Sequence, residues 1–165
     1  MIGYCSDWSI KDGLITGRAL ELAVLVKERT EIFSTFLSGL SSNGEGLKVI
    51  NYLIEHQIFF DPSAINTEEV DDKTFTKLEK EDVLDTLNIN TDLDVLFISA
   101  RTLEEEELCK KLAYAIEQCE HKLCLVLDYT ENTVTKALFA PLKPIYIEKD
   151  MSDEDIIDLL SQSAS

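Results

Sequence analysis

The sequence has few glycines, and all of them lie early in the chain. None of the six follows Gly46, although the chain runs to residue 165. Loops that bind phosphate closely depend on glycine, so the stretch after Gly46 excludes a glycine-built anion hole there. The earlier stretch SGLSSNGEG (38–46) has the glycine spacing of a Walker loop, GxxxxGK(S/T), but Glu45 stands in the place of the lysine. A carboxylate there would repel a triphosphate, which excludes a Walker loop.

Basic residues and long apolar runs are also scarce. The chain has 15 Lys and Arg against 32 Asp and Glu, a net charge of −17. Because nucleic acids and anionic membranes are bound through Lys and Arg contacts to phosphates, this charge opposes both kinds of partner. No apolar run approaches the roughly 20 residues that span a bilayer. The N-terminus, MIGYCSDWSI, lacks the pattern of a secretory signal. We therefore expect a cytoplasmic protein that binds neither nucleic acid nor membrane.

Metal-binding patterns are missing as well. The four cysteines contain no CxxC pair, and His56 and His121 form no ligand pattern with them. The acidic quartet Glu104–Glu107 looks like a metal site, but it is better explained as the first turn of a helix, where the helix dipole favours carboxylates. We expect reduced thiols and no metal.

Hydrophobic periodicity alternates between strand and helix along the chain. This alternation predicts βαβ units and a mostly parallel sheet with helices on both faces, a three-layer α/β fold over residues 1–165 as one domain. The predicted strands are 1–5, 32–37, 94–99, 122–128 and 144–148. The predicted helices are 17–28, 43–56, 103–119 and a last helix opened by Ser152 and Asp155.

Particular residues predict where helices begin and which faces they bury. Ser42 with Glu45, and Thr102 with Glu105, have the spacing of a capping box at a helix start. The side chains that the helix at 43–56 is expected to bury are Leu47, Ile50, Leu53 and Ile54. The polar region 61–92 is predicted to hold a short helix near Asp82–Leu87 and a weak strand around Lys73–Leu78.

Ligands of parallel α/β sheets bind beyond the carboxyl ends of the strands. Asp128 closes the most apolar predicted strand, and it has two interpretations: a working carboxylate, or a loop cap that binds the backbone of Thr130 or Glu131. The sequence leaves both open. No set of nucleophile, histidine and acid can be assembled from the motifs, so we assign no catalytic residue. The other candidates at strand ends are Ser6, Asp7, 38–46, Ser99, Arg101 and 129–132.

Five stretches, in order along the chain, carry a resemblance to a known family. TGRALELAVLVKE (16–28) is similar to a GGxxxN helix, and FSTFLSGLSSNGEGLKVINYLIEHQI to a strand, a GLSxDxxG turn and a helix. LDVLFISARTLEEEELCKKLAYAIEQ is similar to a later strand and helix, CLVLDYTEN (124–132) to SLDPNxR, and KDMSDEDIIDLL (149–160) to a following helix. Together they resemble the fructokinase-type members of the ribokinase (PfkB) carbohydrate kinase family.

The resemblance covers the N-terminal half of that family and implies a truncated ribokinase-like fold. The second half of family members holds the GAGD anion hole, the aspartate that deprotonates the sugar hydroxyl, and the nucleotide pocket. The resemblance also implies a small lid-like extension at 58–80, which in several members pairs with the lid of a second subunit.

Carried over residue by residue, the resemblance gives a set of sugar-binding candidates. Several depart from the pattern of the family: Glu21 replaces the asparagine of GGxxxN, and Asn43 replaces the aspartate of GLSxDxxG. Only Asp128 survives from DPNxR. Each lost polar partner typically costs about 1–3 kcal/mol, so we expect a degraded sugar site. The candidates are Asp12 (or Lys11, depending on a one-residue gap), Gly17, Glu21, Asn43, Asp128 and Asn132.

We therefore predict a non-catalytic, sugar-kinase-like protein that serves as a binding or regulatory module for a sugar ligand. It is expected to form a homodimer through the lid segment or an exposed sheet edge, and to need no cofactor. One alternative is a fructose-like carbohydrate kinase, as a fragment or a subunit, which would need ATP and Mg²⁺. Another is an acidic α/β protein-interaction domain of the receiver or flavodoxin type, although Asp7 and Asp128 do not fall in the order that a receiver needs.

Overall fold

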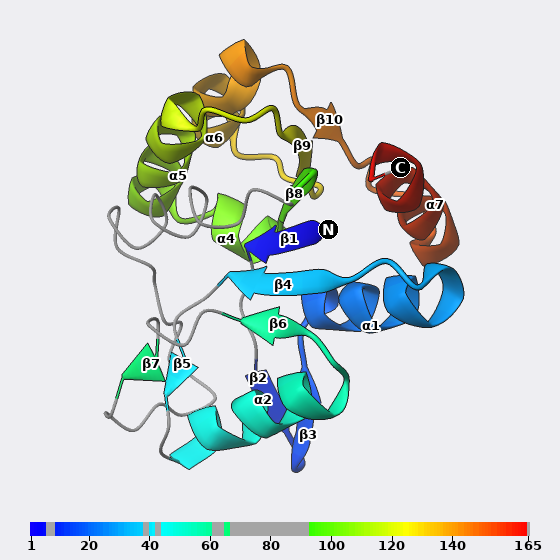
Figure 1. Cartoon of the computed structure of the whole chain (residues 1–165). Coiled ribbons are helices and arrows are strands. Elements are labelled where there is room, and N and C mark those ends of the chain that lie inside the picture. The colour runs from blue at the N-terminus through cyan, green and yellow to red at the C-terminus, as the bar shows by residue number, and fades with distance from the viewer. Residues whose placement is uncertain (6–8, 38–39, 42–43, 61–64, 67–92, 165) are drawn as a thin grey trace.

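A computed structural model describes residues 1–5, 9–37, 40–41, 44–60, 65–66 and 93–164 (Figure 1). Its main element is a sheet of six strands in which all neighbours run parallel. In spatial order the strands are β10 (Ile145–Tyr146), β9 (Cys124–Leu127), β8 (Val95–Ile98), β1 (Ile2–Cys5), β4 (Ser34–Leu37) and β6 (Phe59–Phe60). The predicted mostly parallel sheet is confirmed.

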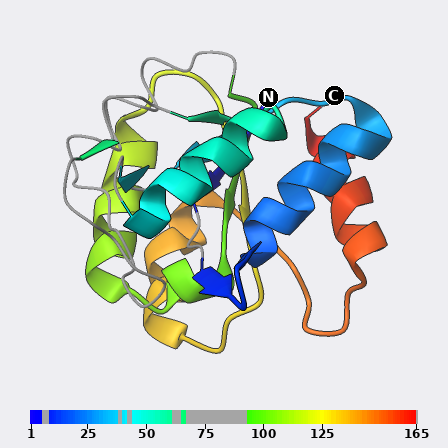
Figure 2. The same ribbon diagram turned by 90° about the horizontal axis from the view of Figure 1, so that it is seen from below.

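Helices cover both faces of this sheet, as Figures 1 and 2 show. On one face Tyr4, Phe36 and Phe97 belong to a buried cluster with α1 (Arg18–Thr30), α2 (Gly44–Glu55) and α7 (Asp153–Ser163). On the other face Leu96 and Leu125 belong to a second cluster. That cluster also takes side chains from α4 (Ala100–Leu103), α5 (Glu106–Gln118) and α6 (Thr133–Phe139), which a 3-10 turn, η2 (Ala140–Leu142), follows. The three-layer prediction is confirmed, because strands buried on both faces need a helical layer on each.

Two small pairs of strands lie outside the main sheet. Strands β2 (Ser9–Lys11) and β3 (Leu14–Thr16) form an antiparallel hairpin, and β5 (Leu40–Ser41) pairs in parallel with β7 (Ile65–Asn66). Asp12 and Gly13 turn the hairpin with φ of 51° and 79°. A two-residue turn with both φ positive matches the twist of a hairpin.

Strand β1 lies inside the sheet, hydrogen-bonded to β4 on one side and β8 on the other. A Cβ built on Gly3 would lie 2.8 Å from Cδ1 of Leu93 and 3.3 Å from Cδ1 of Leu37. Both leucines are buried in the second cluster. Glycine at position 3 therefore lets side chains close over the inner strand.

One predicted helix start is confirmed and another is wrong. Ser152 is the N-cap of α7 and accepts a hydrogen bond from the backbone N of Asp155 at 3.2 Å, as predicted. Thr102 opens no helix: it is buried within α4, and its hydroxyl lies 2.9 Å from that of Ser99. Ser99 is the N-cap instead, because the chain turns into α4 directly after β8. Helix α5 then begins after Glu105, which makes no side-chain cap bond.

The predicted buried row of α2 is half wrong. Ile50 and Leu53 are buried as expected, but Leu47 and Ile54 are 44% and 60% exposed. Gly46 and Val49 complete the buried face. The two rows have the same helical period and differ only by a small rotation, and the packing against the sheet selects between them.

Several predictions lie outside the described residues. These are the cap by Ser42, the helix and strand proposed within 61–92, and most of the lid at 58–80; the lid stays a prediction. Within the described ranges, no helix combines the length and the apolar character needed to cross a membrane.

Candidate functional site

The carboxyl ends of the parallel strands meet at one edge of the sheet, where α/β proteins bind their ligands. Asp128 is the first residue after β9 at this edge, and only 2% of it is exposed. A charge buried so deeply is stable only if other groups compensate it.

Three donors compensate the Asp128 carboxylate. Oδ2 forms an ion pair with Nε of Arg18 and accepts a hydrogen bond from the backbone N of Ala100, each at 3.2 Å. Oδ1 accepts from the backbone N of Tyr129 at 2.8 Å. The carboxylate thus ties the first turn of α1 and the start of α4 to the end of β9. Of the two interpretations from sequence, the cap-like one fits these contacts, although with other partners than Thr130 and Glu131.

The loop after Asp128 is fixed in the same way. Thr130 Oγ1 donates to Oε1 of Glu104 at 2.8 Å. Oδ1 of Asn132 accepts from the backbone N of Val134 and Thr135 at 3.0 and 3.2 Å, which makes Asn132 the N-cap of α6. Its Nδ2 lies 3.5 Å from an oxygen of Glu106. Asn132 therefore holds the loop and the helix start together.

A pocket of about 390 Å³ opens beside this loop, between the ends of β9 and β10. Its size falls within the range of small-molecule sites. Asp128 and Thr130 are already hydrogen-bonded, whereas Lys136, Tyr146 and Glu148 have no side-chain partner among the described residues. The residues that line this pocket, the β9–β10 pocket, are Asp128, Tyr129, Thr130, Lys136, Tyr146, Ile147 and Glu148.

Tyr129 lies at the mouth of the pocket and is held by charged neighbours. Its hydroxyl donates to Oε1 of Glu131 at 2.9 Å, and this hydrogen bond raises the pKa of the Tyr129 phenol. Nζ of Lys149 lies 5.9 Å from the ring centroid. These two contacts fix the orientation of the Tyr129 ring, which forms one side of the pocket.

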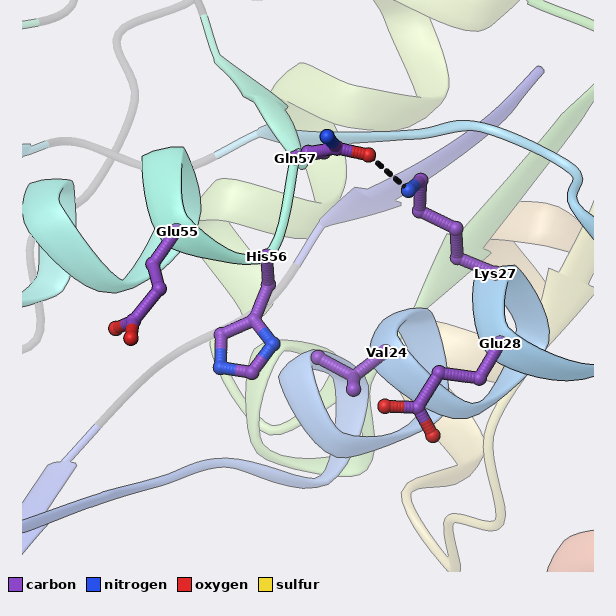
Figure 3. A pocket seen from close by; sticks show the side chains of 6 residues that line it. All are labelled: Val24, Lys27, Glu28, Glu55, His56 and Gln57. Atoms are coloured by element: carbon purple, nitrogen blue, oxygen red, sulfur yellow. Dashed lines mark hydrogen bonds between the residues drawn. The ribbon is translucent and has the colours of Figure 1, made fainter.

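A smaller pocket of about 210 Å³ lies at the opposite edge of the sheet, where α1 and α2 end (Figure 3). Nζ of Lys27 donates to Oε1 of Gln57 across it. Burial raises the pKa of the Tyr52 phenol, and the carboxylates of Glu21, Glu28 and Glu55 raise it further. The imidazole of His56 lies 4.3 Å from the Tyr52 ring, centroid to centroid. The residues that line this pocket are Val24, Lys27, Glu28, Glu55, His56 and Gln57.

Acidic residues do not gather into a metal site in the part of the chain that the structure describes: no group of three or more His, Cys, Asp or Glu there could hold an ion. In the quartet Glu104–Glu107, Glu104 binds Thr130, and Glu107 pairs with Lys110 at 3.0 Å.

Solved structures with this arrangement of strands and helices are known. A PfkB family carbohydrate kinase of Listeria grayi matches with a TM-score of 0.64 at 12% identity, over 99% of this chain and 68% of that one. The chain has a ribokinase-like fold. An uncharacterized sugar kinase of Pyrococcus horikoshii matches with a TM-score of 0.56 at 13% identity, over 99% and 62%. Ribokinase of Giardia lamblia matches with a TM-score of 0.52 at 11% identity, over 99% and 65%.

At these identities the likeness establishes the ribokinase-like fold alone. No family model and no curated protein sequence matches the chain. The chain spans about two thirds of the length of the kinases that it matches. The resemblance predicted from the motifs is thus confirmed at the level of the fold.

The ribokinase-like fold brings some of the predicted sugar residues together. Gly17, the N-cap of α1, is next to Arg18, which binds Asp128, and Asn132 lies four residues along the same loop. Asp12 lies instead in the turn of the β2–β3 hairpin. The carboxylate of Glu21 raises the pKa of the Tyr52 phenol on α2, which lines neither the Asp128 loop nor the β9–β10 pocket. Asn43 lies outside the described residues. Of the five candidates that the structure describes, only Asp128 lines the β9–β10 pocket, and the sugar-binding set stays a prediction.

The structure adds residues that the sequence reasoning missed. Arg18 has no motif that links it to Asp128, so only the fold reveals the pair. Tyr146 and Glu148 had a usable signal, because the strand at 144–148 was predicted and its carboxyl end faces the ligand edge. Lys136 had none.

Proposed function

We propose that the protein is a PfkB-type, sugar-kinase-like binding module that does not transfer phosphate by itself. The observation that carries this proposal is the state of Asp128, the buried carboxylate at the ligand edge. It is held by Arg18, Ala100 and Tyr129, so it is not free to act as a general base. A base must be within reach of the proton that it removes and able to accept it.

The glycine distribution supports the same proposal. Phosphoryl transfer depends on positioning and on stabilising charge, for which kinases of this family use a glycine-built anion hole. Residues 47–165 contain no glycine to build one. In this proposal the ribokinase-like fold keeps the sheet edge at which a sugar kinase binds its ligand, but it has no anion hole to stabilise a transferred phosphate.

A coupled assay tests this proposal. The purified 165-residue chain is mixed with ATP, Mg²⁺ and a panel of sugars that includes fructose, and ADP formation is followed against a control without sugar. We expect no sugar-dependent ADP. A sugar-dependent rate that disappears in Asp128→Asn would overturn the proposal and make the chain a carbohydrate kinase.

A second candidate is one subunit of a carbohydrate kinase. Its nucleotide pocket and anion hole would then be supplied by a second chain. The match to about two thirds of each kinase chain favours it. The test is the same assay with lysate fractions from the source cells added: a fraction that gives sugar-dependent ADP only together with this chain would support the subunit role.

A further inference from the structure

We draw no further inference here: the strongest candidate, the partly buried side-chain pair of Cys119 and His121 between the end of α5 and the start of β9, places the thiol sulfur 3.2 Å from Nδ1 of the imidazole, yet it carries nothing, because a single thiol beside one histidine does not indicate a ligand or a reactant, and no third group in the described ranges joins the pair to hold a metal ion.

Discussion

At the scale of single residues, Asp128 acts as a structural junction. Its two oxygens contact Arg18 of α1, the backbone N of Ala100 in α4, and the backbone N of Tyr129, the next residue in the chain. A buried carboxylate of this kind does little for stability relative to a well-packed apolar residue, but the loss of one partner leaves the others uncompensated. The edge of the sheet that carries the candidate site therefore depends on this residue.

Replacement of Asp128 tests that role. We expect Asp128→Ala to lower the free energy of unfolding by about 2–4 kcal/mol, because two backbone donors lose their buried acceptor and the half-exposed Arg18 loses its ion-pair partner. Urea denaturation followed by circular dichroism measures the change. The control is Glu154→Gln, which removes the exposed pair with Arg29 at 3.5 Å and should cost less than about 0.5 kcal/mol. Similar losses in the two variants would contradict the role assigned to Asp128.

The buried thiols make stability depend on alkaline pH. Burial raises the pKa of Cys5 and of Cys109 from 9.0 to about 12. In the unfolded chain both thiols ionise first, so their contribution to stability is complete below about pH 9 and is lost as the pH rises toward 12. Urea denaturation over this range should show falling stability, with a shallower fall in Cys109→Ala. If the free energy of unfolding fell equally steeply with pH in Cys109→Ala and in the wild type, Cys109 would not contribute to the pH dependence.

At the scale of elements, α6 depends on its cap. Asn132 accepts bonds from the first backbone N–H groups of that helix. We expect Asn132→Ala to cost about 1 kcal/mol in the free energy of unfolding, and Asn132→Asp to cost little because aspartate caps equally well. Thermal denaturation compares the three proteins. If Asn132→Asp were as destabilised as Asn132→Ala, capping would not be the role of Asn132.

The elements were largely predictable from sequence because their signals are local. The apolar run that became β9 and the pair Ser152 and Asp155 at α7 each reveal their structure within a few residues. The prediction of a cap at Thr102 was wrong because Ser99, three residues earlier, is the N-cap instead. Which of the two residues caps the helix depends on where β8 ends, and the local sequence does not fix that point. Likewise, the sequence around Leu47 does not determine which of two neighbouring faces of α2 packs against the sheet, and the face that contains Leu47 is the exposed one.

The candidate site was less predictable, for a physical reason. Asp128 could be found because it ends an apolar strand, yet its partner Arg18 comes from the other end of the chain. Tyr146 and Lys136 join one pocket only because β10 pairs with β9 and α6 lies beside them. Such contacts follow from the order of the strands in the sheet. The family resemblance predicted the fold, but it did not predict which side chains would meet in the pocket.

At the scale of the whole molecule, apolar side chains are exposed beside β6, an outermost strand of the sheet within the described ranges. Phe33 and Phe59 are 49% and 54% exposed, and their ring centroids lie 5.7 Å apart. Exposed edge strands with apolar side chains tend to pair with another chain. We keep the homodimer as a proposal, with this edge as one interface.

Light scattering coupled to size exclusion tests the dimer. We expect a mass of twice 18.6 kDa at micromolar concentration, and a shift toward the monomer in Phe59→Ser. The control Val134→Ser changes a comparably exposed apolar residue on α6, and it should leave the mass unchanged. A monomeric wild type would end the proposal.

The inner position of β1 also bears on how the protein is made. This strand precedes β8 by about ninety residues in the sequence, yet β8 is one of its two neighbours in the sheet, with Ile2 opposite Val95. During synthesis β1 can pair with β4 long before β8 exists. One backbone edge of β1 therefore stays without its final partner until β8 has been translated, and during that period the nascent chain most needs a chaperone.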